Sequence, residues 1–188
     1  MLPLDDPRWH ELWTGYSAAH RFLPALRRLA DDPLTFPSVL SEFDSENYVC
    51  HQCSVYHTTL AVVPHFVHAA GRLPPADRGE LLAAAGFYAL LLAAPPPDAP
   101  RMPSPPEWLA ADYDRAVRAA LPLAGEALAA PPGGADPERG RLHLMAGLAG
   151  FHGQWRVGVL LTALAGYTVM CRWCEAEFDP LAEWGRGF

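Results

Sequence analysis

The chain has 188 residues, of which 51% are hydrophobic, and it carries a formal net charge of −7. This length and apolar content suit one folded domain with a core of its own and exclude a wholly disordered chain. The negative charge argues against a general nucleic-acid-binding protein, because such a protein needs a basic face for the phosphate backbone.

Membrane insertion and export are not indicated by the apolar pattern. The longest apolar stretch, residues 81–94, is 14 residues long, shorter than the about 20 that a membrane-spanning helix needs. The first residues, MLPLDDPRWHEL, have neither the basic start nor the apolar run of a signal peptide. We therefore expect no membrane partner and a cytoplasmic location, where thiols stay reduced and cysteines indicate metal or redox chemistry before disulfides.

Helical patterns follow one another along the chain. Asp5-Asp6-Pro7 is typical of a helix start, and Trp9 and Trp13 follow it at helical spacing. Further helices are predicted in residues 18–32, 36–43, 54–73, 74–94, 104–130, 139–151 and 153–166. The helix at 74–94 is apolar on all sides and is expected at the centre. Only residues 167–178, YTVMCRWCEAEF, predict strand-turn-strand, so the fold class is all-α with a small C-terminal β-hairpin.

A weak internal repeat has an offset of 40 residues. RFLPALRRLA at 21–30 aligns with AVVPHFVHAA at 61–70, placing Pro24 on Pro64, and a third Leu-Pro step occurs at Pro122. Such steps can also arise by coincidence, since the chain has 20 prolines. A period of roughly 40, with a proline inside the second helix of each pair, is typical of HEAT-type hairpins, which bury their apolar faces by stacking. We expect HEAT-like stacked hairpins over residues 1–166 and a C-x-x-C knuckle at 167–188 packed on them.

The run HQCSVYHTTLAVVPHFV follows an acidic helix and resembles a set of uncharacterised bacterial HEAT-like proteins. In these proteins a His-Gln…Tyr element precedes a helix of the form AxxPxLV, and the chain often ends in a cysteine pair. The resemblance spans residues 5–72 and 165–178 and is carried by His51, Gln52, Tyr56, Pro64 and Val67. It implies an α-helical repeat fold and no particular activity. Where that pattern has glycine this chain has Cys53, which completes the first cysteine pair.

The four cysteines form two C-x-x-C pairs, Cys50 with Cys53 and Cys171 with Cys174, with 117 residues between them. This spacing directs two thiolates at one ion, and zinc prefers four such ligands in a tetrahedron. We interpret the pairs as one structural zinc site that fixes the C-terminal hairpin to the start of the helix at 54–73. A site closed by four thiolates has no open position for substrate and stabilises the fold.

Three other interpretations of the cysteines remain open. The pairs could be independent redox dithiols, although the βαβ context of such proteins is missing. His51 or His57 could replace one cysteine as a ligand. The cysteines could also be small buried apolar residues without a metal.

Other titratable residues give weaker signals. His65 and His68 are three residues apart on one predicted helix, and we interpret them as a solvated or half-buried pair near its end. Asp112 and Asp114 flank Tyr113 and are interpreted as a solvated helix face. The chain has no H-E-x-x-H, phosphate-loop or nucleophile-elbow motif.

Two functional hypotheses follow. The first is a cytosolic protein-interaction module, such as an immunity or antitoxin protein, that binds a protein partner on its concave surface. The second is a small-molecule enzyme of a bacterial biosynthetic pathway, with a site around His51, Gln52, Tyr56 and His57 and an acidic residue, Glu42 or Asp44, nearby. A deep polar pocket holding these side chains would indicate the enzyme, and a shallow apolar groove the binding module. A HEAT-like DNA-repair glycosylase is a third hypothesis; the negative net charge disfavours it, and it would need an arginine-lined cleft.

Overall fold

The structure is a computed structural model that describes residues 1–12, 19–46, 50–51, 54–93, 102–131, 136–166, 169–170 and 177–178. α-Helices dominate this part of the chain, so the predicted all-α class is confirmed. The described helices are α1 (Leu23–Asp31), α2 (Phe36–Glu46), α3 (His57–Gly71), α4 (Gly79–Ala93), α5 (Glu107–Ala129), α6 (Pro137–Phe151) and α7 (Trp155–Leu164). Short 3₁₀ helices are η1 (Pro7–Glu11), η2 (Ala19–Phe22), η3 (Pro33–Thr35) and η4 (Pro75–Asp77).

The first element differs from its prediction, because η1 is a short 3₁₀ helix and not the start of an α-helix. Asp6 caps it by accepting a hydrogen bond from the Arg8 backbone N–H at 2.9 Å, but Leu12 already has extended dihedrals. Trp9 gives the physical reason. Its ring is fully buried and its Nε1–H donates to the Pro3 carbonyl oxygen at 2.7 Å, which folds the first residues back over η1.

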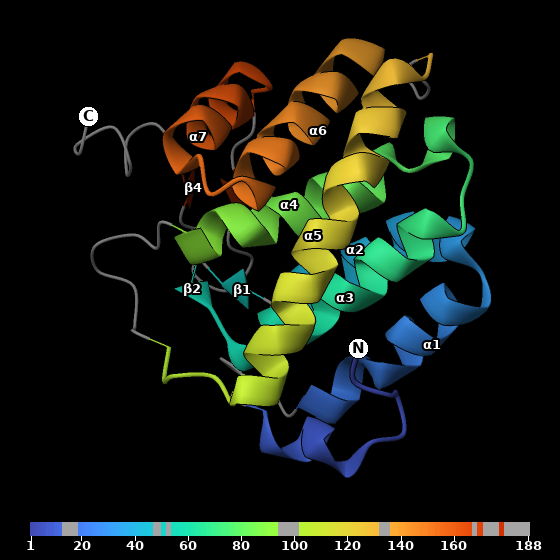
Figure 1. Ribbon diagram of the computed structural model, residues 1–188, viewed down its shortest axis with the longest axis vertical. Coiled ribbons are helices and arrows are strands. Elements are labelled where there is room, and N and C mark those ends of the chain that lie inside the picture. The colour runs from blue at the N-terminus through green and yellow to red at the C-terminus, as the bar shows by residue number, and fades with distance from the viewer. Residues whose placement is uncertain are drawn as a thin grey trace.

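The helices form two sets of packed neighbours. α3 packs along α5 and contacts α1, whereas α4 packs along α6, and α7 packs on α6. Figure 1 shows α5 running across the front of the molecule, with α6 and α7 at the top and α1 at the lower right. Alternate helices of the chain are therefore spatial neighbours, and consecutive helices also pack on each other, as α3 does on α4 and α6 on α7.

Helix α4 has the central place that its apolar sequence predicts. It contacts α3, α5, α6 and α7, and Leu82, Leu90 and Leu91 are fully buried. No helix in the described ranges is long and apolar enough to cross a membrane.

An aromatic cluster joins the first four helices. Phe22, the last residue of η2 directly before α1, packs edge-on against Phe43 of α2 with ring centroids 5.7 Å apart, and Phe43 stacks on Phe66 of α3 at 5.8 Å. Phe66 also contacts Phe36 of α2 at 5.1 Å and Tyr88 of α4 at 6.1 Å. Burying each of these rings contributes roughly 1.5–3 kcal/mol, so this cluster ties the N-terminal helices to α4.

Helices α4 and α6 cross through three glycines. A Cβ atom on Gly86 would overlap the backbone of Gly147, and one on Gly150 would overlap the Gly86 carbonyl oxygen. A Cβ atom on Gly147 would lie 3.0 Å from the Leu82 carbonyl oxygen. The absence of side chains at these positions lets the two backbones touch, which explains why α4 and α6 form the most extensive helix contact described.

Two short antiparallel ladders interrupt the helical chain. β1 (Cys50–His51) pairs with β2 (Ser54–Val55), with Cys50 opposite Val55. β3 (Val169–Met170) pairs with β4 (Glu177–Phe178), with Val169 opposite Phe178. The first ladder was not predicted, since two residues per strand leave no alternation to detect. Residues 171–176 lie outside the described residues, so a zinc knuckle on the second ladder stays a prediction.

Candidate functional site

The two cysteine pairs fall at the two ladders. Cys50 is the first residue of β1, and Cys53 directly precedes β2 in the chain. Cys171 directly follows β3, and Cys174 precedes β4 by three residues. Only the backbone of Cys50 is described, and the other three cysteines lie outside the described residues. The described residues hold no group of three His, Cys, Asp or Glu side chains that could bind a metal ion.

Tyr56 and His57 are placed at the start of α3, where they take part in the fold. Both side chains are buried. The Tyr56 backbone N–H donates to Thr59 Oγ1 at 2.9 Å, half of a capping box that satisfies the first turn of the helix. The His57 Nε2 lies 3.0 Å from the Pro103 carbonyl oxygen and donates to it. These contacts connect α3 to the segment that precedes α5.

The other members of the predicted polar site are described only in part. His51 is described by its backbone in β1, and Gln52 lies outside the described residues. Glu42, one of the two acidic candidates, forms an ion pair with Arg28 of α1. The side chain of Asp44 is not among those described. The structure therefore does not show His51, Gln52, Tyr56 and His57 converging on one polar pocket.

The interpretation of His65 and His68 as a solvated or half-buried pair is wrong for His65, which is buried within the core. His68 is exposed, but His65 is only 6% exposed and packs against Trp9 with ring centroids 5.8 Å apart. Its Nε2 lies 3.1 Å from the Leu2 carbonyl oxygen. Burial lowers the pKa of His65 to about 4, so the ring is neutral at pH 7 and Nε2–H donates to Leu2. The cause is the N-terminal segment, which folds over this face of α3.

Asp112 is also not the freely solvated residue that was predicted. Its carboxylate lies 3.0 Å from the Met1 amino group and 2.5 Å from the Arg115 guanidinium. Although partial burial would raise the pKa of Asp112, its hydrogen bonds with these two cations lower it overall. Asp112 therefore holds the first residue against α5.

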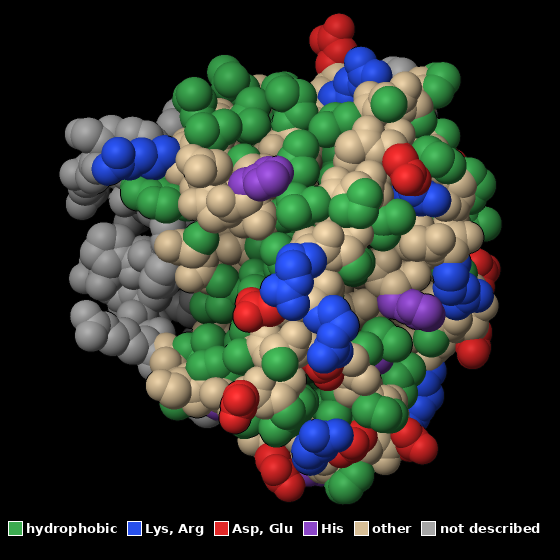
Figure 2. All heavy atoms as spheres, in the orientation of Figure 1, with side chains coloured by type: hydrophobic (Ala, Val, Ile, Leu, Met, Phe, Trp, Pro, Cys, Tyr) green, Lys and Arg blue, Asp and Glu red, His purple; other side chains and the backbone are tan. Residues whose placement is uncertain are grey.

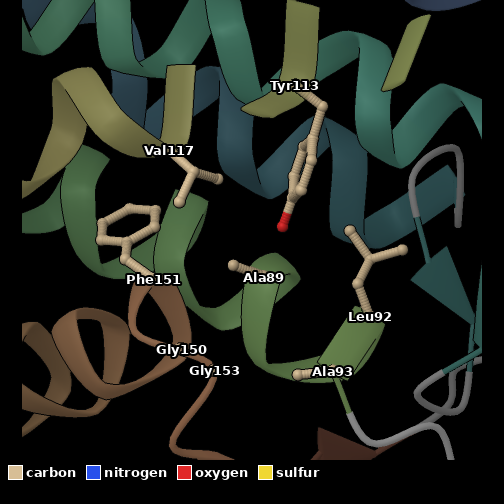
Figure 3. A pocket seen from close by; sticks show the side chains of 8 residues that line it. All are labelled: Ala89, Leu92, Ala93, Tyr113, Val117, Gly150, Phe151 and Gly153. Carbon is tan, nitrogen blue, oxygen red and sulfur yellow. The ribbon is translucent and has the colours of Figure 1, made fainter. Parts of the chain in front are cut away.

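A hollow of the described surface lies between α4, α5 and the end of α6. Its volume is about 280 Å³, and it is open to solvent. The residues that line it are Ala89, Leu92, Ala93, Tyr113, Val117, Gly150, Phe151 and Gly153. Figure 3 shows the Tyr113 hydroxyl pointing into this space, toward Ala89. We call it the α4–α5–α6 hollow.

The chemistry of this hollow is apolar with one polar group. Burial raises the pKa of the Tyr113 phenol well above its ordinary value of 10.0, and the nearby Asp114 carboxylate adds to this effect. Tyr113 therefore stays protonated at neutral pH and can donate one hydrogen bond. The described lining holds no carboxylate, histidine or arginine. Among the described lining residues, the Tyr113 hydroxyl is therefore the one side-chain group that can form a hydrogen bond.

Sequence reasoning missed this hollow. Its walls come from three helices whose residues are ordinary apolar positions in the sequence, and only their packing makes them neighbours. The one available signal was Tyr113, a bulky aromatic among the charged residues at the start of α5.

Comparison with known proteins gives no family for this chain: no family model, no curated protein and no solved structure matches it. The resemblance to bacterial HEAT-like proteins therefore stays a prediction.

Proposed function

We propose that the chain is a cytosolic protein-interaction module, built from HEAT-like stacked hairpins and clasped by one structural zinc ion. The observation that carries the proposal is the α4–α5–α6 hollow, which is apolar, open and without acid or base groups among its described residues. A partner protein would insert an apolar side chain there and accept a hydrogen bond from the Tyr113 hydroxyl. Apolar anchors in such pockets supply much of the affinity of protein interfaces.

The packing order of the helices supports the HEAT-like part. In a stack of hairpins each helix contacts its partner in the hairpin and the equivalent helix of the next hairpin. α3 meets α5 and α4 meets α6 in this way. Pro24, Pro64 and Pro122 lie in α1, α3 and α5, which places the three aligned segments in alternate helices.

The alternative, an enzyme, has less support from the described side chains. Tyr56 and His57 are buried in contacts that cap and anchor α3. The hollow itself lies among other residues and contains neither of them. A deep polar pocket would favour an enzyme, whereas an open apolar hollow such as this one favours a binding module.

The zinc clasp is supported by the placement of the cysteine pairs. In the sequence, each pair is adjacent to a short described antiparallel ladder: Cys50 is in β1, and Cys171 follows β3 directly. The two-residue spacing of each pair suits two thiolates bound to one ion. The ligands would be Cys50, Cys53, Cys171 and Cys174. Bound zinc would supply folding free energy by joining the start of α3 to the C-terminal segment, and a reducing compartment would keep the thiols available.

The interaction is tested with a matched pair of tryptophan substitutions. Ala93 lines the hollow and is exposed, and Ala119 is an exposed residue of α5 outside its described lining. Ala93→Trp fills the hollow, whereas Ala119→Trp adds the same side chain elsewhere. Proteins captured by each immobilised full chain from a cell lysate are compared by mass spectrometry, and the binding constant of any differential partner is then measured with purified proteins.

We expect a partner that binds the wild type and Ala119→Trp with equal affinity. Its affinity for Ala93→Trp should be at least about tenfold lower, which corresponds to about 1.4 kcal/mol. Equal binding to both variants would contradict the proposed use of the hollow. Circular dichroism confirms that both variants remain folded.

A further inference from the structure

Helix α7 presents an apolar stripe to solvent. Val157, Leu160 and Leu164 are 50%, 52% and 65% exposed, and their spacing of three and four residues places them on one face of the helix. The opposite face, with Gly158, Val159 and Thr162, is buried. We call Val157, Leu160 and Leu164 the α7 stripe.

The stripe is unusual for the surface of an isolated domain. Single exposed apolar residues are common, but a helical row of three large ones indicates a covering element. Figure 2 shows hydrophobic side chains gathered at the top of the molecule, where α6 and α7 lie in Figure 1. α7 is also the last described helix, so no later described helix covers the stripe.

The end of the chain starts close to this stripe. Val169 follows Leu164 by five residues, and it pairs with Phe178 in the second ladder. Phe178, the last described residue, is thus tied through Val169 to the end of α7, and ten residues follow it in the sequence. Ten residues reach roughly 33 Å when extended, and the ten residues of α7 span about 15 Å. The segment 179–188 is long enough to run along the whole stripe.

The sequence of this segment matches the stripe. Leu181, Trp184 and Phe188 have the same spacing of three and four residues as Val157, Leu160 and Leu164. Asp179-Pro180 is typical of a helix start, which would place Leu181 and Trp184 on one face. Contact between these three residues and the α7 stripe would remove apolar surface of both from water. Burial of apolar surface stabilises by roughly 25 cal/mol per Å².

We propose that residues 179–188 dock on α7 of the same chain and cover the α7 stripe, with Trp184 against Leu160 as the central contact. A second copy of the chain is the less favoured occupant. The tethered segment is present at millimolar effective concentration, as short flexible linkers are, and two copies that each carry a formal charge of −7 repel one another. In this arrangement the segment covers the exposed face of α7.

The direct test is nuclear Overhauser spectroscopy on the isotope-labelled full chain. The Trp184 indole is assigned from the signal that disappears in Trp184→Phe. We expect cross-peaks between this indole and the methyl groups of Leu160 and of Val157 or Leu164. Leu34, which is 68% exposed at η3, is the matched control and should show none. The absence of cross-peaks from Trp184 to any methyl group of the stripe would overturn the proposal.

A mixed sample of labelled and unlabelled chains distinguishes the two occupants. Cross-peaks confined to labelled chains confirm docking within one chain. Cross-peaks between labelled and unlabelled chains would overturn it in favour of a dimer through α7. Hydrogen exchange adds an independent measure: Trp184→Ala should speed exchange of the α7 amides about tenfold while leaving α3 unchanged, and unchanged α7 exchange would contradict the contact.

Discussion

Gly86 of α4 and Gly147 of α6 lie in backbone contact, so that a single Cβ atom on Gly86 would overlap the Gly147 main chain. Because backbone cannot move aside as a flexible side chain can, the clash can be relieved only by separating the two helices. The crossing joins the central helix to the part of the molecule that carries α7, and it also forms the floor of the α4–α5–α6 hollow through Gly150.

Gly86→Ala should therefore destabilise the protein by about 3 kcal/mol, toward the upper end of what overpacking costs. Gly140→Ala, in the first turns of α6, is the matched control. A Cβ atom there meets nothing within 4 Å, and alanine should stabilise the helix by roughly 0.5–1 kcal/mol. Urea unfolding of the three proteins measures both effects. A Gly86→Ala protein as stable as the wild type would show that the helices do not touch here.

His65 predicts a loss of stability in mild acid. Its pKa is about 4 in the folded protein and 6.5 in the unfolded chain. Below pH 6.5 His65 is protonated in the unfolded chain but stays neutral in the folded protein. The free energy of unfolding therefore falls as the pH drops toward 4. The loss from this residue is about 1.4 kcal/mol per pH unit across that window, or roughly 2 kcal/mol between pH 6.5 and pH 5.

The measurement compares urea unfolding at pH 7 and pH 5 in the wild type and in His65→Gln, which cannot titrate. The difference between the two pH values should shrink by about 2 kcal/mol in His65→Gln, because the other titrating groups act equally on both proteins. An identical pH dependence of wild type and His65→Gln would show that His65 is not buried in neutral form.

Arg78 should be required for the junction between α3, α4 and α5. Its guanidinium is largely buried, donates to the Leu73 carbonyl oxygen at 2.8 Å through Nε, and forms an ion pair with Glu126 of α5. Arg78→Met keeps the apolar stem and removes both interactions, so we expect a loss of about 1–2 kcal/mol in the free energy of unfolding, mainly from the Leu73 carbonyl. Arg118→Met, at an exposed position of α5, should change it by less than about 0.5 kcal/mol. Similar values for the two variants would contradict this role.

The fold was largely predictable where the pattern is local and long. The apolar period placed α3 to α7 within a few residues of their observed limits, and the unbroken apolar run of α4 indicated its central position. The predicted α-helix at the start of the chain was wrong. Trp9 is buried there, and its hydrogen bond to the Pro3 carbonyl oxygen folds the first residues back over η1. The burial of Trp9 depends on its contacts with Phe22 and with His65 of α3. The apolar spacing within residues 1–12 carries no information about these distant partners.

The site was less predictable because it depends on helix crossings. The glycines at 86, 147 and 150 are unremarkable one by one, and they become a contact only when α4 and α6 cross at that height. The positions of Tyr113 at the hollow and of His65 in the core likewise depend on how segments distant in the sequence pack together. The cysteine pairs gave the clearest chemical signal in the sequence, and the structure adds a short ladder next to each pair in the chain.

The shared zinc site predicts that the two cysteine pairs respond alike to mutation. Cys50→Ser and Cys171→Ser should each release the metal and lower the melting temperature of the full chain to a similar extent, since three remaining thiolates bind zinc far more weakly. Chelation of the wild type should produce the same shift, and it should not shift either variant further. Loss of metal in only one of the two variants would indicate separate sites.

X-ray absorption spectroscopy of the purified full chain, loaded with one equivalent of zinc, tests the clasp most directly. It should show a single shell of four sulfur ligands at about 2.3 Å. A shell containing nitrogen or oxygen, or only two sulfur atoms per ion, would contradict the joining of the two ends of the chain through one metal.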